Sequence, residues 1–594
     1  MSRPSIYTGP SLSDRTIRLL FICPSPDSQR RIECYCHPFD IEATPPYEAL
    51  SYVWGVDDPT TKVAILCNGE EITIGAALAS ALRRLRLADR ERVLWADAVC
   101  INQSDNDEKS LQVPMMGSIY SLAKRVVVWL GHGNSHQIRE ATQCVRIVGK
   151  ACREHEASSK VFRKYEALVL AGDTVSPAVC AALKELYDRA WFSRVWCIQE
   201  IKLARDAIVL WGEQEVSWSD VGLTAWWISN NIALVSSLGQ VSKDYLNALV
   251  MYAPSPYQMK LLPALYLYRT FEATDPRDKV YGLLSLVEPE EEVKVLELDY
   301  NKNAGEVYAD TVLSTIRLYS RLTALCYVAH PPDYDEADGI KSWAPRWGKL
   351  SWTTMTIYFS EPDNPWSACR GHLVERVDNH HITLEQLQLK GILYDTVTAI
   401  HTIMTDDNLR SPENLHGIHP FLDAQRDVIS SAVLTSDNAY KEQQWCKLAR
   451  TLSAGWLFYG ERVSNSDRDA QETFYDAFAA MMQDLYHRTS RHFVPESSDA
   501  QIPAYEQYQD VAYNVCRHRR VFKLQDGSYG LGPQCMRAGD IVVVLYGGAT
   551  PYVLRPKRHQ YLFMGEAYVD EIMRGELVDE VETERRPEQD FCIV

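Results

Sequence analysis

Strand-like and helix-like runs alternate along the first 220 residues, and this alternation limits the fold classes open to the chain. Apolar, β-branched runs predict strands, and they are separated by stretches such as residues 78–85, where leucine recurs at helical spacing. Such alternation favours an α/β fold, with a mostly parallel sheet and flanking helices. The expected strands are residues 17–22, 31–36, 48–53, 63–67, 70–74, 92–97, 125–130 and 207–211.

Two local signals sharpen this prediction. Asn68-Gly69 separates two strand-like runs and predicts a two-residue hairpin, because both turn positions need positive φ. Pro114 falls inside the helix expected after Asp105, where it would remove a backbone donor, so we expect that helix to break or restart. Sheets of this class bind ligands beyond the carboxyl ends of their parallel strands.

The rest of the chain carries weaker signals. A length of 594 residues allows three or four domains of about 150 residues each. Glycine-punctuated short strands after residue 521 are compatible with a small barrel and with a sheet packed on helices. We expect a domain at 1–220, a mixed helical and strand accessory region at 221–400, a helical region at 401–510 that ends in a linker, and a β-rich region at 511–594 that ends in an acidic, solvated tail.

Charge and composition exclude several functions. A net charge of −18 opposes binding to phosphate backbones, so we expect no nucleic-acid partner. No apolar run approaches the roughly 20 residues of a membrane span, and the N-terminus lacks the pattern of a secretory signal. The 15 cysteines have no zinc-binding spacing and are explained as reduced thiols. We therefore expect a cytoplasmic protein without a bound metal.

Two common nucleotide-binding motifs do not occur. Gly131-His132-Gly133 follows an expected strand, but position 136 is His where a dinucleotide-binding loop has its third glycine. The G-x-x-x-x-G-K-[ST] phosphate loop does not occur either. The arginines at 83–92 are interspersed with acidic residues, which favours a solvated helix face over an anion-binding edge.

Two clusters of aromatic and polar residues stand where expected strands end. Aromatic rings in the first cluster could wall a pocket for a flat ligand, with a glycine that lets the backbone turn closely. Core packing is the competing explanation for the first cluster, and turn formation for the second. The candidate binding residues are Tyr52, Trp54 and Gly55 in the first cluster, and Asp97, Asn102 and Gln103 in the second.

A third cluster, at residues 191–200, holds the candidate for acid–base chemistry. On a helix, Ser193, Trp196 and Glu200 share one face. A carboxylate one turn from a tryptophan on a partly apolar helix loses solvation, which raises its pKa and favours proton transfer. The structural alternative is an ion pair between Glu200 and Arg194 or another arginine.

Together and in this order, the three clusters resemble the heterokaryon incompatibility (HET) domain of filamentous fungi. The resemblance covers residues 47–201, and its most specific segments are ALSYVWG at 49–55, LWADAVCINQ at 94–103 and RVWCIQE at 194–200. Two further segments resemble HET-containing proteins outside that domain. They are DPRDKVYGL at 275–283, and GDIV at 539–542 together with GEAYV at 565–569.

The resemblance implies a role in nonself recognition, with programmed cell death when incompatible partners fuse. It also implies a remote relationship to TIR domains, whose sheet is flavodoxin-like and some of whose members cleave NAD. TIR enzymes carry a catalytic glutamate at the end of a Trp-Cys-x-x-Glu segment, which residues 196–200 match. Arg194 occupies the position of the usual TIR serine, and Ser193 stands one residue away.

By this resemblance Glu200 would be the catalytic residue, and NAD would be a substrate rather than a cofactor. Cleavage of the ribose–nicotinamide bond develops positive charge at the anomeric carbon, as in glycoside hydrolysis. Glu200 would hold the ribose hydroxyls and stabilise that charge. The ring-stacking candidates are Tyr52, Trp54 and Trp196, and the ribose-positioning candidates are Asp97 and Asn102.

The first hypothesis is therefore an incompatibility effector with NAD glycohydrolase activity that needs no metal. The alternative is a noncatalytic signalling module that self-associates through the same domain. A third possibility is a HET domain that has become a metabolic or structural part. The expected partners are NAD, a second copy of the chain, or other incompatibility proteins.

Overall fold

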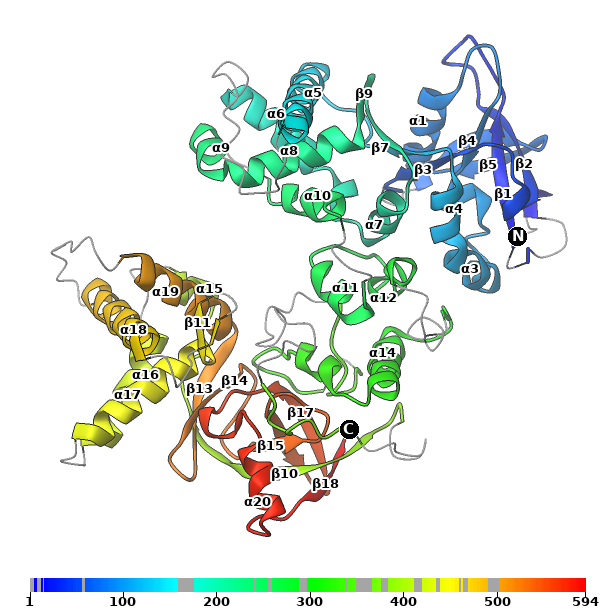
Figure 1. Cartoon of the computed structure of the whole chain (residues 1–594). Coiled ribbons are helices and arrows are strands. Elements are labelled where there is room, and N and C mark those ends of the chain that lie inside the picture. The colour runs from blue at the N-terminus through cyan, green and yellow to red at the C-terminus, as the bar shows by residue number, and fades with distance from the viewer. Residues whose placement is uncertain are drawn as a thin grey trace. The chain divides into compact units, whose positions relative to one another are not determined.

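The computed structural model of the chain contains two compact units, residues 1–303 and 304–594, each with its own sheet (Figure 1). The division that the sequence suggests, into residues 1–220, 221–400, 401–510 and 511–594, stays a prediction. The structure describes residues 5–7, 12–13, 15–55, 59–158, 176–239, 242–254, 259–287, 296, 298–336, 339–348, 366–374, 383–410, 419–433, 438–458, 461–462, 468–489 and 502–594.

Unit 1 is built on a nine-stranded sheet with the order β5-β4-β2-β1-β6-β3-β7-β8-β9. Strands β3 and β8 are buried along their whole length and β7 in all but its first residue, which explains why they read as continuous apolar runs. The strands are β1 (Thr16–Ile22), β2 (Glu33–Asp40), β3 (Glu48–Tyr52), β4 (Val63–Cys67), β5 (Glu70–Ile74), β6 (Arg92–Trp95), β7 (Arg125–Trp129), β8 (Ala207–Trp211) and β9 (Gln214–Ser217).

The four neighbouring strands β6, β3, β7 and β8 pair in parallel at the centre of this sheet. Numbered by their order in the chain, they lie as 2-1-3-4, which is the flavodoxin-like order. The predicted α/β class is thereby confirmed. Antiparallel pairs flank this centre, β2–β1–β6 and β4–β5 on one side and β8–β9 on the other, so the complete sheet is mixed.

Both local signals of this region are confirmed. Asn68 and Gly69 have φ of 53° and 81° and join β4 to β5 in a hairpin. One helix ends at Gln112, a 3₁₀ turn containing Pro114 follows, and the next helix begins at Met116. The helices of unit 1 are α1 (Ala76–Leu85), α2 (Asp97–Cys100), α3 (Asn106–Gln112), α4 (Met116–Leu122), α5 (Ser135–Ser158), α6 (Pro177–Tyr187), α7 (Val195–Lys202), α8 (Trp218–Asn230), α9 (Ile232–Leu238), α10 (Tyr245–Tyr252), α11 (Leu261–Leu267) and α12 (Asp278–Tyr281).

Unit 2 contains a barrel closed by one long strand, β10 (Leu387–Ile400). The strand pairs with β18 through its first residues, with β15 in its middle and with β13 at its end. Gly391 stands where the partner changes, and a Cβ there would collide with the carbonyl oxygen of Val544. The other strands are β13 (Arg519–Leu524), β14 (Tyr529–Pro533), β15 (Ile541–Leu545), β16 (Tyr552–Lys557), β17 (Gln560–Glu566) and β18 (Gln589–Ile593).

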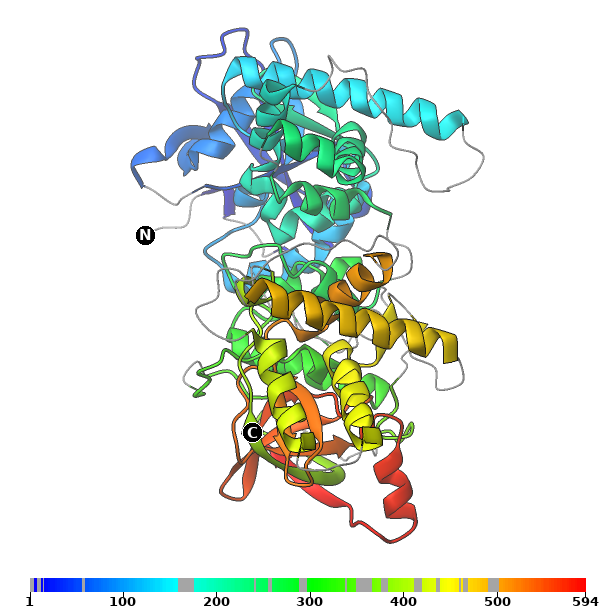
Figure 2. The same ribbon diagram turned by 90° about the vertical axis from the view of Figure 1, so that its left-hand side faces the viewer.

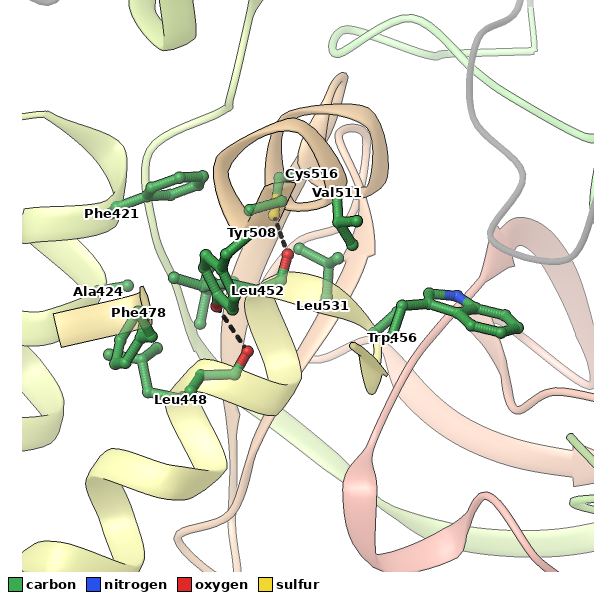
Figure 3. Close-up of a cluster of buried hydrophobic side chains, with 14 of the residues drawn as sticks. Phe421, Ala424, Leu448, Leu452, Trp456, Phe478, Tyr508, Val511, Cys516 and Leu531 are labelled. Atoms are coloured by element: carbon green, nitrogen blue, oxygen red, sulfur yellow. Dashed lines mark hydrogen bonds between the residues drawn. The ribbon is translucent and has the colours of Figure 1, made fainter. Parts of the chain in front are cut away.

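The chain between β10 and β13 forms a helical group with its own core beside β14 (Figure 2). Figure 3 shows this core, in which Tyr508 donates to the carbonyl oxygen of Ala449 at 2.7 Å and the Cys516 thiol donates to that of Leu452 at 3.0 Å. The elements of unit 2 outside the barrel are α14 (Ala304–Tyr319), α15 (Asp406–Arg410), α16 (Pro420–Val433), α17 (Asn438–Ser453), β11 (Trp456–Phe458), β12 (Glu461–Arg462), α18 (Arg468–Thr489), α19 (Ile502–Cys516) and α20 (Glu576–Glu582).

The structure corrects the expectation that the acidic end is a tail. Residues 576–582 form α20, and residues 589–593 form β18, which pairs with β10. The acidic side chains near the end are largely exposed, so their charges remain solvated while their backbone is part of the barrel. The expected linker is also shorter than predicted, because α19 begins at Ile502, and residues 490–501 lie outside the described part of the chain.

Two findings concern the described residues as a set. No helix among them is both long enough and apolar enough to cross a bilayer. Likewise, within the described ranges no group of three or more His, Cys, Asp or Glu side chains could hold a metal ion.

A buried ion pair joins Arg519 on β13 to Glu566 on β17. Arg519 Nη2 lies 2.6 Å from Glu566 Oε1, and the two side chains are only 2% and 1% exposed. Arg519 Nη1 also donates to the backbone carbonyl of Glu566 at 3.1 Å. Removing one partner of a buried pair leaves a charge without compensation, which costs far more than the loss of an exposed pair.

We therefore expect Arg519→Ala to lower the free energy of unfolding by about 3–5 kcal/mol. Urea unfolding followed by tryptophan fluorescence measures the change. The matched control is Lys557→Ala, because Lys557 pairs with Glu336 at 2.8 Å from a side chain that is 47% exposed. That control should cost less than about 1 kcal/mol. An equal loss of unfolding free energy in the two variants would show that the buried pair stabilises the fold no more than an exposed pair does.

Candidate functional site

The candidate site lies at the carboxyl edge of the central parallel strands. Strand order changes direction between β3 and β7, so the switch point lies where Tyr52 ends β3 and Trp129 ends β7. On the other side of β3, strand β6 leads into Asp97. Trp54 Nε1 donates to Asp97 Oδ2 at 2.9 Å. Side chains from the first two predicted clusters therefore meet at the edge where ligands of such sheets bind.

Glu200 is brought to β3 by helix α7 (Figure 1). Its side chain is 5% exposed, and its Oε2 accepts a hydrogen bond from Ser51 Oγ, which is fully buried. Ser51 Oγ in turn accepts from Trp191 Nε1 at 2.7 Å. The indole thus orients the hydroxyl, and the hydroxyl orients the carboxylate, so the position of Glu200 is set by a chain of buried hydrogen bonds.

Arg194 supplies the positive charge of the site. It precedes α7, and its Nη1 donates to the carbonyl oxygen of Tyr52 at 3.0 Å. Its charge lowers the pKa of both Glu200 and Asp97. Among the described residues Glu200 forms no ion pair, so the structural alternative of a salt bridge with Arg194 does not describe this site. Arg194 acts on the two carboxyl groups through space.

The surroundings of Glu200 bring its pKa close to neutral pH. Burial raises its pKa, and so does the nearby charge of Asp97, while the Ser51 hydrogen bond and the Arg194 charge oppose the rise, so that the pKa is about 7. Burial also raises the pKa of Asp97, against the Arg194 charge and hydrogen bonds from Ala98 N–H and Trp54. A carboxyl group with a pKa of about 7 can exchange a proton near neutral pH, which is the property needed for general acid–base chemistry.

Three other predicted residues also lie at this edge. The Tyr52 hydroxyl is buried and interacts with Asp97, which raises the pKa of the phenol well above its usual range. Gln103 Nε2 donates to the carbonyl oxygen of Asp97 at 2.9 Å. Gly55 has a φ of +82°, a left-handed conformation that favours glycine, although the space around it is open. Trp54 is 40% exposed, so its ring is accessible from solvent.

Two predicted residues direct their polar atoms elsewhere. The Asn102 side chain accepts from the backbone N–H and the hydroxyl of Ser104, as expected for a turn. Trp196 Nε1 donates to Asp278 Oδ2 at 2.8 Å, in the 275–283 segment that resembles HET-containing proteins outside the three clusters. The structure therefore brings Tyr52, Trp54 and Gln103 to Asp97, whose charge acts on Glu200, whereas the polar groups of Asn102 and Trp196 are engaged in other contacts.

Sequence reasoning missed the residues that hold Glu200. Ser51 lies on a strand that is buried throughout, and a buried hydroxyl needs a partner, which was the available signal for a polar neighbour. Tyr120 on α4 donates to the carbonyl oxygen of Leu50 at 3.1 Å and lowers the pKa of Glu200. Ser193, considered for its place near the TIR serine, donates to the carbonyl oxygen of Ala190 at 3.0 Å. The hydroxyl beside Glu200 belongs to Ser51.

Comparison with known proteins gives two family matches and one full-length relative. Residues 47–200 match the model of the family described as heterokaryon incompatibility protein (HET), and residues 454–594 match that of the Het-6 β-barrel domain. The chain is 27% identical to "Heterokaryon incompatibility protein 6, OR allele" of Neurospora crassa over 690 aligned positions, which cover 99% of this chain and 98% of that protein. No solved structure matches the chain.

The raised pKa of Glu200 predicts a pH-dependent loss of stability. The group binds its proton more tightly in the folded chain, with a pKa of about 7 against an ordinary value of 4.5, so stability falls as pH rises between those values. Glu200→Gln removes this titration. Relative to the wild type, we expect the variant to gain about 2–3 kcal/mol of unfolding free energy between pH 5 and pH 8, as measured by urea unfolding.

Glu213→Gln is the matched control, because the Glu213 side chain is 84% exposed. It should leave the pH dependence of unfolding unchanged. If Glu200→Gln and the wild type lose stability in parallel from pH 5 to pH 8, Glu200 titrates as an ordinary solvated carboxyl group and the electrostatic description of the site is wrong.

Ser51→Ala tests the hydrogen bond to Glu200. The Ser51 hydroxyl stabilises the ionised carboxylate, so its removal should raise the pKa of Glu200 above about 7. Infrared difference spectra against pH, assigned by the band that Glu200→Gln abolishes, report this titration. Ser193→Ala removes a hydroxyl bonded to Ala190 and should not move it. A lower titration midpoint in Ser51→Ala would contradict the arrangement.

Proposed function

We propose that this chain, which matches the HET family at residues 47–200 and the Het-6 β-barrel family at 454–594, acts in fungal nonself recognition. In this proposal the HET domain is the effector, and it cleaves NAD when incompatible partners fuse, which leads to cell death. The full-length similarity to a protein named for heterokaryon incompatibility supports the biological role.

One observation carries the proposed chemistry. Glu200 is a buried carboxyl group with a pKa of about 7, held by Ser51 at the switch point of a flavodoxin-like set of strands. Perturbed carboxyl groups at such positions are candidates for catalysis. The exposed ring of Trp54 beside Asp97 offers a stacking surface at the same edge.

The reaction can be written with its atoms in balance. The bond between the anomeric carbon and the nicotinamide nitrogen breaks, and its electron pair stays on the ring, so nicotinamide leaves as a neutral molecule. Water adds to the oxocarbenium-like carbon and its proton passes to the Glu200 carboxylate, then to solvent, leaving ADP-ribose. The ionised form of Glu200 also stabilises the positive charge that develops on the ribose.

The direct test is release of nicotinamide from NAD by the purified full-length chain, followed by chromatography at several protein concentrations. We expect turnover in the wild type and a rate about 10²- to 10⁴-fold lower in Glu200→Gln. The exposed Glu213→Gln should match the wild type. Turnover that survives Glu200→Gln would remove Glu200 from the reaction.

Absence of turnover at every concentration, together with self-association of the chain, would favour the noncatalytic signalling module instead. Expression in a fungal host separates the two functions further. Growth arrest caused by the wild type and abolished by Glu200→Gln is expected for NAD cleavage. Growth arrest that both proteins cause equally would assign the effect to assembly, and absence of growth arrest would fit a structural or metabolic role.

A further inference from the structure

The segment that follows α11 wraps around the start of helix α7. The backbone N–H of Val195 donates to the carbonyl oxygen of Glu272 at 2.9 Å, and the N–H of Glu272 donates to the carbonyl oxygen of Ser193 at 2.5 Å. These two bonds form a parallel bridge between Arg194 and Glu272. The first turn of a helix leaves its N–H groups without partners inside the helix, so this bridge supplies one of them from outside.

Asp278 makes a second connection to the same helix. Its Oδ2 accepts from Trp196 Nε1 at 2.8 Å, and its Oδ1 accepts from the Tyr300 hydroxyl at 2.9 Å. Both carboxylate oxygens therefore have fixed donors, one on α7 and one on the chain after α12. Burial raises the pKa of Asp278 to about 6, as expected for a carboxyl group largely removed from water.

Tyr300 links this connection to helix α3. Lys109 Nζ on α3 lies 4.7 Å from the centre of the Tyr300 ring, and the Arg277 guanidinium lies 5.1 Å from it. Arg277 also pairs with Asp275 at 2.6 Å. The tyrosine is thus held by two cations while its hydroxyl donates to Asp278, so that Asp278 is fixed by Tyr300 as well as by α7.

The remaining residues of the 275–283 motif support the same arrangement. Lys279 donates to the backbone carbonyl oxygens of Arg269, at 2.9 Å, and Phe271, which fixes the segment that carries Glu272. A Cβ at Gly282 would lie 3.3 Å from Val195 Cγ1, so the absence of a side chain allows close packing against the start of α7. Asp278 and Gly282 of this motif therefore contact the helix that carries Glu200 directly, and Lys279 fixes the segment that bonds to its start.

Helix α7 is too short to be stable without contacts to the rest of the fold. It has eight residues, and a helix of that length is unstable in isolation. Its far end is tied by Lys202, whose Nζ donates to the carbonyl oxygen of Ala253 at 2.7 Å. Trp196 lies one turn before Glu200, so a change at the Trp196–Asp278 contact tilts the turn from which the Glu200 carboxylate reaches Ser51.

We propose that Asp278 and Tyr300 are positioning residues, which hold helix α7 through Trp196 so that Glu200 meets Ser51 and Arg194 meets the end of β3. The positioning itself is a property of the fold. Its effect on a reaction rests on the proposed NAD cleavage, for which a displacement of about 1 Å at the reacting groups can cost about 10²-fold in rate.

The test uses the full-length chain with Asp278→Ala and Tyr300→Phe. Hydrogen–deuterium exchange is followed at the amides of 195–202, with β3 and β15 as internal references. We expect exchange in α7 to rise at least about tenfold in Asp278→Ala and less in Tyr300→Phe, which loses one hydrogen bond. The infrared titration of Glu200 should move away from about 7, because both the burial that raises its pKa and the Ser51 and Arg194 contacts that lower it depend on the position of α7.

Glu272→Ala is the matched control, because Glu272 contributes its backbone to the bridge and its side chain is exposed. It should change neither α7 exchange nor the Glu200 titration. If Asp278→Ala does not fold, Tyr300→Phe decides by the same two measurements. Unchanged α7 exchange and an unchanged Glu200 titration in the folded variant would overturn the proposal.

A kinetic measurement completes the test and keeps the two proposals separate. If the wild type cleaves NAD, Asp278→Ala should lower kcat by about 10²-fold with little change in KM. A change in KM with kcat unchanged would contradict the proposal that Asp278 positions Glu200. If the wild type does not cleave NAD, the exchange and titration results still decide whether Asp278 positions α7, while the proposed function fails by itself.

Discussion

The contact between Ser51 on β3 and Glu200 on α7 is the interaction on which the candidate site depends. A carboxyl group this deeply buried is costly unless it is hydrogen-bonded or protonated, and here both conditions contribute, because its pKa stands at about 7. The contact joins the central parallel strand to a helix residue 149 positions later in the chain. Trp191 and Arg194, on either side of it, then fix the hydroxyl and balance the charge.

Around this contact, unit 1 combines two kinds of support. The central strands supply a rigid edge, since β3 is paired in parallel on both sides. Glu272, Asp278 and Tyr300 supply the second support, which holds α7 through backbone bonds and the Asp278 carboxylate. Unit 2 follows a different principle, because its barrel is closed by a single strand, β10, that pairs with three others.

Much of the fold could be predicted because its signals are local. The Asn68-Gly69 turn and the break at Pro114 follow from backbone geometry at one or two residues. Candidate residues at strand ends, such as Trp54 and Asp97, follow from the rule that ligands bind at that edge. The acidic end was misjudged because exposed charges indicate solvation of side chains and carry no information on whether the backbone pairs in a sheet.

The sequence by itself determined the α/β class, the order of the motifs and the residue types present at the candidate site. Only the tertiary structure decided that Ser51 rather than Arg194 bonds Glu200, that Asp278 holds Trp196, and that β10 closes the barrel. The physical reason is distance along the chain. Periodicity and turn chemistry act over a few residues, whereas a buried polar group takes whichever partner the packing of remote segments brings within hydrogen-bond reach.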